Sequence, residues 1–226
     1  MTNAHRWTVD VGDRTTSAEY DAPSSGEEAA LFVCAHGAGG NMADRSVLAT
    51  AKALRERGLG VVRFNFLYKE RESGRPDPMP RLTATFEAVV SRVRDELAPR
   101  RLIIGGRSMG GRAASVLASE GFDADGLLLF AYPLHPPGQA EKLRTEHLPR
   151  IRMPVLAFSG TRDPFCTPAL MESAVASVTA PWEMVWVDDA DHSFHVLKSS
   201  GRTDAQVMGE MADRAAIWAS GLGGDR

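Results

Sequence analysis

Apolar residues along this chain gather in short runs, and segments with helical periodicity separate these runs. The expected strands are residues 29–37, 60–68, 101–106, 126–134, 154–160 and 182–189, and the expected helices are 41–58, 81–99, 109–121, 141–148, 168–178 and 203–222. Runs that are apolar almost throughout are typical of strands buried on both faces of a parallel sheet. The pattern therefore predicts an α/β fold, with a doubly wound, mostly parallel sheet and helices on both faces.

The first 21 residues differ from the rest, because they alternate weakly and contain turn residues. They predict a short hairpin, which residues 24–28 link to the regular part. Two connections leave strand ends, namely the charged, proline-rich loop from Tyr68 to Leu82 and the segment from His135 to Arg152. The second is too short for a large lid domain, so we expect an open, shallow site at the carboxyl ends of the strands.

Composition narrows the class of protein. A chain of 226 residues with 43% hydrophobic residues is expected to form a single domain, 1–226. Its net charge of -3 gives no footprint for nucleic acid or an anionic membrane surface. No apolar stretch approaches the roughly 20 residues of a membrane span, and the first residues do not resemble a signal peptide. With only two cysteines, and Cys34 inside an apolar run, we expect a cytoplasmic protein.

One serine lies among glycines at the end of an expected strand. Gly106-Arg107-Ser108-Met109-Gly110 matches G-x-S-x-G, between a strand and a helix, which is the setting of a nucleophile elbow. A glycine-rich turn with an idle serine is the plain alternative. A phosphate-binding loop would need lysine and a hydroxyl residue where Gly111 and Arg112 stand. The other glycine cluster, residues 36–42, has Met42 in place of the third glycine of a dinucleotide fingerprint, so no cofactor is expected.

A serine nucleophile needs a base and an acid that holds the base. Asp163 follows the strand at 154–160, and His192 follows the strand at 182–189, in the chain order Ser, Asp, His. The rival base is His195, and the rival acids are Asp188, Asp189 and Asp191, which we interpret as a solvated acidic loop. His192 and His195 lack the further ligands that a metal site needs, so none is predicted.

Other residues are assigned around this core. The backbone N–H groups of Ala38 and Met109 are the expected oxyanion hole. Met109 directly follows Ser108 at the start of a helix, and Ala38 lies in the glycine-rich loop after the strand at 29–37. His36 is expected to support its loop through hydrogen bonds. The candidate substrate-binding residues are His36, Gly37, Arg107, Arg71 and Arg75. The arginines would attract an anionic acyl group, or they are solvated or anchor loops. We expect Trp182, Trp186 and Trp218 to pack a strand against the final helix.

With these motifs the chain resembles the α/β-hydrolase superfamily over almost its full length. HGAGG, GRSMG, GTRDPF and DADHSF carry the likeness. Within it the chain is similar to the small lidless hydrolases related to dienelactone hydrolases. GGRSMGGR and FNFLY are closer to the branch with a testis-expressed protein and a chromatin-complex subunit. Dienelactone hydrolases use a cysteine where this chain has Ser108, which argues against dienelactone as the substrate.

The resemblance implies Ser108 as nucleophile, Asp163 as acid and His192 as base. We therefore expect a serine hydrolase, specifically a carboxylesterase that acts on small or exposed acyl esters, with a small-molecule ester as its partner. The alternative is a non-catalytic interaction scaffold with the hydrolase fold.

Overall fold

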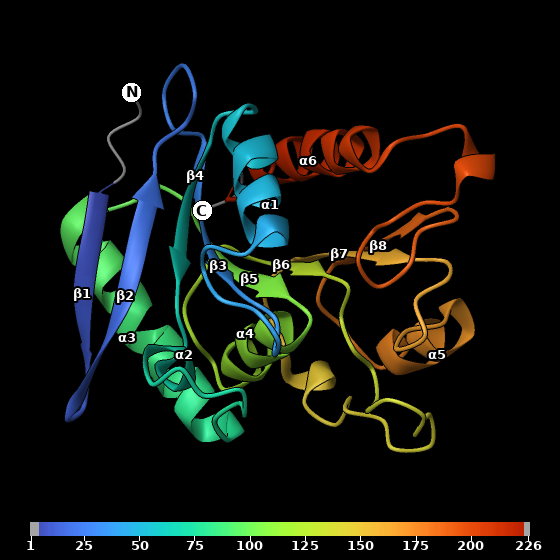
Figure 1. The fold of residues 1–226 in the computed structure, drawn as a ribbon, viewed down its shortest axis with the longest axis horizontal. Helices are drawn as coiled ribbons and strands as arrows, with labels where there is room; N and C mark the ends of the chain where they lie inside the picture. The colour runs from blue at the N-terminus through green and yellow to red at the C-terminus, as the bar shows by residue number, and fades with distance from the viewer. Residues whose placement is uncertain (1–4, 224–226) are drawn as a thin grey trace.

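The computed structural model describes residues 5–223, which form one eight-stranded sheet with helices on both faces (Figure 1). The strands are β1 (His5–Val11), β2 (Arg14–Asp21), β3 (Ala30–Ala35), β4 (Leu59–Phe64), β5 (Leu102–Arg107), β6 (Gly126–Phe130), β7 (Val155–Gly160) and β8 (Trp182–Val187). The helices are α1 (Arg45–Arg55), α2 (Leu67–Glu70), α3 (Met79–Leu97), α4 (Met109–Ser119), α5 (Pro168–Val175) and α6 (Asp204–Ser220), with 3₁₀ turns at Leu148–Arg150 and Lys198–Ser200.

The strand order is β1-β2-β4-β3-β5-β6-β7-β8. β1 and β2 form the predicted hairpin, and β2 pairs antiparallel with β4, whereas every pair from β4 to β8 is parallel. The strands β3 to β7 are buried along nearly their whole length, as their apolar runs predict. The predicted fold class is therefore confirmed.

Two apolar cores lie on opposite faces of the sheet. α1 and α6 cover one face, and α3, α4 and α5 cover the other (Figure 1). The expectation for the tryptophans is correct only for Trp218, which packs with the α1 and α6 core, while Trp182 and Trp186 pack into the opposite core. Alternate residues of a strand point to one face, and in β8 the face of Trp182 and Trp186 is turned away from α6.

The expected helix at residues 141–148 is wrong. Only the 3₁₀ turn Leu148–Arg150 forms there, at the end of the long connection from β6 to β7. The backbone of Arg144 bonds instead to neighbouring groups, since its N–H donates to Leu134 O and its carbonyl accepts from the Tyr132 hydroxyl. Along residues 5–223, no helix is both long and apolar enough to cross a membrane.

Candidate active site

Ser108 occupies the sharp turn between β5 and α4. Its backbone has φ of 50° and ψ of −116°, a conformation that costs energy for a residue other than glycine. A Cβ placed on Gly106 would lie 2.3 Å from the Ala35 carbonyl oxygen, and one on Gly110 would lie 2.5 Å from the same atom. The end of β3 thus leaves no room for side chains two residues before or after Ser108, which explains both glycines of G-x-S-x-G.

Ser108, His192 and Asp163 are brought together from three strand ends. Ser108 Oγ lies 3.0 Å from His192 Nε2, and His192 Nδ1 lies 2.7 Å from Asp163 Oδ2. In this arrangement Nδ1–H donates to the carboxylate and Nε2 is left to accept the serine proton. The geometry is that of a nucleophile, a base and a group that orients the base.

Asp163 is fixed by its surroundings and is only 2% exposed. Its Oδ1 accepts a hydrogen bond from the Phe165 N–H at 2.8 Å, and its Oδ2 also accepts from the Ser159 hydroxyl at 3.4 Å. The ring of Phe165 packs edge-on against His192, with 4.6 Å between centroids. The imidazole is therefore held both by a hydrogen bond and by an aromatic contact.

Arg107 anchors the loop that carries His192. Its guanidinium donates to the His192 carbonyl oxygen and lies over the ring of Phe194, 5.6 Å from its centroid. Burial lowers the pKa of this guanidinium, while the nearby Asp163 and Asp191 oppose the shift. Of the interpretations open for Arg107, the loop anchor is the one with observed contacts.

The rival base His195 does not contact Ser108. It is exposed, and its Nδ1 lies 2.9 Å from Asp204 Oδ2. Asp191, one of the rival acids, uses Oδ1 to accept from the N–H groups of Ser193 and His195, so it shapes the loop rather than orienting His192.

A second serine–histidine contact exists, between Ser115 Oγ and His147 Nε2 at 2.8 Å. Ser115 is fully buried within α4, and its hydroxyl donates to the Arg112 carbonyl oxygen. No carboxylate contacts the His147 ring in the described part of the chain. Burial and the nearby Arg112 lower the pKa of His147 to about 4. A substrate carbonyl has no access to this pair, so its contacts are structural.

Both cysteine thiols are buried as well. Burial raises the pKa of Cys34 to about 12 and that of Cys166 to about 12. A thiol with so high a pKa is protonated near neutral pH, and the thiolate is the nucleophilic form. Neither cysteine therefore takes the place of Ser108.

The loop after β3 lies beside the nucleophile, since a Cβ on Gly37 would be 3.7 Å from Ser108 Cβ. Within residues 5–223, the N–H groups of Ala38 and Met109 have no hydrogen-bond acceptor in the protein. Two free donors beside a serine are the composition of an oxyanion hole.

His36 and Tyr68 hold this loop in shape. His36 Nδ1 donates to the Gly37 carbonyl at 2.8 Å, and Nε2 accepts from the Phe66 N–H at 3.1 Å. Burial lowers the pKa of His36 to about 4, so the ring is neutral and keeps these two roles. The Tyr68 hydroxyl donates to the Ala38 carbonyl at 2.8 Å. His36 is thus in the supporting position that the sequence predicts.

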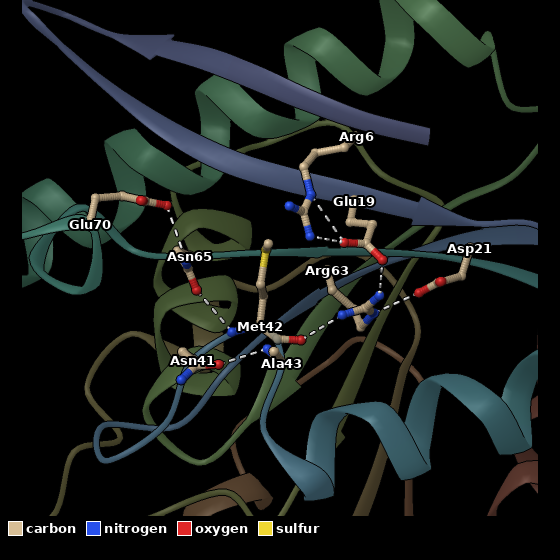
Figure 2. Close-up of polar contacts among 9 residues, drawn as sticks. All are labelled: Arg6, Glu19, Asp21, Asn41, Met42, Ala43, Arg63, Asn65 and Glu70. Atoms are coloured by element: carbon tan, nitrogen blue, oxygen red, sulfur yellow. Dashed lines mark hydrogen bonds and ion pairs between the residues drawn. The ribbon is translucent and has the colours of Figure 1, made fainter. Parts of the chain in front are cut away.

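Sequence reasoning missed Arg63, which lies inside β4 and is only 3% exposed (Figure 2). Its guanidinium donates to Asp21 and Glu19 of β2 at 2.6 and 2.8 Å, and to the Met42 carbonyl at 2.7 Å. Asn65 accepts from the Met42 N–H at 2.9 Å. A lone arginine in an apolar strand was the available signal, because a buried charge requires partners.

A cleft of about 660 Å³ opens over Ser108. Gly37, Ala38, Met109, Arg107 and His192 line it, whereas Arg71 and Arg75 do not. Arg71 pairs with Asp77 at 2.8 Å, and Arg75 is exposed on the loop before α3. The structure therefore does not bring these two predicted substrate-binding arginines to the cleft, and His36, also a candidate, is fully buried and does not line it. Arg112 and Arg144, which the sequence analysis did not propose, line it instead.

Comparison with known proteins adds the family. The model of the alpha/beta hydrolase domain matches residues 28–220. The chain belongs to the α/β hydrolase family. Its fold is also that of solved structures at low sequence identity, which extend over nearly whole chains.

An α/β serine hydrolase homologue from Coxiella burnetii is 24% identical, with a TM-score of 0.77 over 95% of this chain and 98% of that one. A serine hydrolase without a lid from Xanthomonas campestris is 22% identical, with a TM-score of 0.76 over 100% and 98%. A dienelactone hydrolase from Anabaena variabilis is 19% identical, with a TM-score of 0.74 over 96% of each chain. This α/β hydrolase thus shares the fold of these structures, of which the second is described as lidless.

Proposed function

We propose that this α/β hydrolase is a carboxylesterase that cleaves small or exposed acyl esters through Ser108, His192 and Asp163. The observation that carries the proposal is the continuous chain of contacts from Ser108 Oγ through His192 to the buried Asp163. Solved structures of similar fold include proteins named as esterases, such as an esterase domain from Rhodothermus marinus and an esterase from Pyrococcus furiosus. Their names support the choice of an ester bond.

The proposed reaction has two halves. Ser108 Oγ bonds to the ester carbonyl carbon as its proton passes to His192 Nε2, and the carbonyl oxygen becomes an anion that the Ala38 and Met109 N–H groups face. The C–O bond to the leaving alcohol then breaks, and that oxygen takes the proton from Nε2. Water attacks the acyl-enzyme in the same way and releases the acid and free Ser108.

A fluorophosphonate probe and p-nitrophenyl butyrate test this proposal. We expect the native protein to be labelled and to hydrolyse the ester, and Ser108→Ala to lose both. Ser115→Ala is the matched control, because Ser115 also contacts a histidine but is buried, so its labelling should persist. A native protein with neither labelling nor turnover would contradict the esterase and favour the non-catalytic scaffold. Labelling that survives in Ser108→Ala would contradict the nucleophile.

A further inference from the structure

Two arginines face the cleft without a carboxylate partner. Arg112 lies one helical turn after Ser108 on α4, and Arg144 lies in the connection from β6 to β7. In the part of the chain that the structure describes, neither guanidinium forms an ion pair or a hydrogen bond within the protein. By contrast, the third arginine of the cleft, Arg107, is engaged with His192 and Phe194.

The carboxylates of the cleft are not available to these arginines. Asp77 is nearly buried, and its Oδ1 receives Arg71 at 2.8 Å and Arg81 at 3.4 Å. Its Oδ2 is buried without a hydrogen-bond partner, so Asp77 contacts neither Arg112 nor Arg144. Asp44 lies against Gly40 and lines both this cleft and a second cavity between α1 and α6, but it forms no ion pair with Arg112 or Arg144. The positive charge of Arg112 and Arg144 is therefore uncompensated by the protein.

A buried polar network holds the two arginines near one another. His147, three residues after Arg144, bonds to Ser115, three residues after Arg112. The Tyr132 hydroxyl donates to the Arg144 carbonyl at 3.2 Å. The loop that carries Arg144 is thus attached to the helix that carries Arg112. The structural role of the Ser115–His147 contact is to fix this loop to α4.

This arrangement costs free energy in the absence of an anion. Arg112 Nε is buried and has no hydrogen-bond partner, which leaves a donor unsatisfied. Burial, and after it the charge of Arg112, lowers the pKa of Arg144. An anion between the two guanidinium groups would supply acceptors and oppose the repulsion, and the guanidinium fork fits a carboxylate or phosphate.

We propose that Arg112 and Arg144 bind an anionic group of the substrate, a carboxylate or a phosphate, while Ser108 attacks its ester bond. The inference rests on the proposed esterase function and narrows its substrates to esters with a negative charge at a distance from the scissile bond. The anion lies on the side of the cleft formed by α4 and the β6–β7 connection.

Two esters of similar length test the preference. p-Nitrophenyl hydrogen adipate carries a terminal carboxylate, and p-nitrophenyl heptanoate ends in an ethyl group instead. We expect kcat/KM to be about 10-fold or more higher for the adipate, since one well-placed charged hydrogen bond provides that factor. The ratio should fall towards 1 in Arg112→Gln and in Arg144→Gln, and raising the salt concentration should lower it in the native protein. Arg150→Gln, on the same connection but outside the cleft, should retain the native ratio.

Calorimetry separates this inference from the proposed function, because it needs no turnover. Hexanoate should bind more tightly than hexanamide to the native protein, and the difference should vanish in the double variant Arg112→Gln/Arg144→Gln. Tighter binding of pentyl phosphate than of hexanoate would identify phosphate as the preferred group. Hydrolysis of both esters at equal rates, with no preference for hexanoate, would overturn the anion site and leave the esterase standing. If the native protein hydrolysed neither ester but still bound hexanoate more tightly than hexanamide, the esterase function would be overturned and the anion site would stand.

Discussion

In the proposed reaction, the two contacts that activate Ser108 are arranged in series, from Ser108 to His192 and from His192 to Asp163. The outer contact would therefore affect the chemistry without touching the substrate. Asp163 meets only Nδ1 of His192, the side of the ring turned away from Ser108. Its carboxylate selects the tautomer in which Nε2 is free to accept a proton, and it stabilises the imidazolium that forms.

Asp163→Asn should therefore lower kcat by about 10³–10⁴-fold, because an amide in this position favours the wrong tautomer. Steady-state hydrolysis of p-nitrophenyl butyrate measures the loss, and circular dichroism checks that the fold is retained. The matched control is Asp188→Asn, an exposed carboxylate just before the His192 loop, which should keep native kcat. Equal losses in the two variants would contradict the role of Asp163.

At the same scale, the three proposed catalytic residues were predictable because each directly follows a recognisable strand. Arg112 and Arg144 could not be predicted, because the proposed role of these two residues depends on their lack of carboxylate partners, which only the structure shows. Arg71 shows the converse, since its charge suggested a ligand in sequence and is taken by Asp77 in the structure. Sequence alone gives the positions of charges along the chain but not their partners in space.

At the scale of elements, the close approach of β3 and the turn after β5 decides where side chains are tolerated. Gly106 has φ of 147°, and its missing Cβ faces the Ala35 backbone rather than a movable side chain. Because Gly106 and Ala35 are paired across β5 and β3, the two strands cannot move apart to make room without breaking the pairing between them.

Gly106→Ala should consequently lower the free energy of unfolding by about 3 kcal/mol or more, since overpacking and a strained φ act together. Urea denaturation of the purified variant measures this. Gly74→Ala is the control, because a Cβ there meets nothing within 4 Å and the change should stay within about 0.5 kcal/mol. A Gly106→Ala protein as stable as the native one would contradict the packing that we describe.

Elements also show where prediction from the sequence ends. Apolar runs predicted β3 to β7, because burial on both faces leaves a strong local pattern. The β1–β2 hairpin was predicted from weak alternation and turn residues, and the predicted strand β8 is only partly buried. The expected helix at 141–148 failed because a short helix is marginal by itself and the Arg144 backbone bonds to Tyr132 and Leu134 instead. The expectation for Trp182 and Trp186 was wrong because the alternation along β8 shows that they share a face but does not show which helices cover that face.

At the scale of the whole molecule, two buried histidines make stability depend on pH. His36 and His147 both have pKa values lowered to about 4 by burial, whereas an unfolded histidine titrates near 6.5. Between about pH 6.5 and pH 4 the unfolded chain binds more protons than the folded one, so stability falls as pH falls.

We expect the free energy of unfolding to be highest above about pH 6.5 and to decline down to pH 4, by on the order of 3 kcal/mol from His36 alone. Urea titrations at a series of pH values measure the slope, and His147→Gln should make it shallower. His195 has the opposite sign, because Asp204 raises its pKa, so it adds stability as pH falls through that raised pKa towards 6.5. His195→Gln should remove this gain above pH 6.5 and leave the decline between pH 6.5 and 4 unchanged. A flat profile between pH 6.5 and 4 would contradict the buried neutral histidines.

Arg63 connects a strand that lies outside the family match, β2, to a loop that lies inside it. The match begins at residue 28, after the hairpin, yet both carboxylates that neutralise Arg63 come from β2, and the third partner of Arg63 is Met42 in the glycine loop. A fragment that starts at residue 28 would keep Ser108, His192 and Asp163 but would leave a buried guanidinium without its counterions. A piece of this hydrolase that keeps the loop of Met42 in place therefore includes the hairpin, so the structural unit is larger than the part by which the family is recognised.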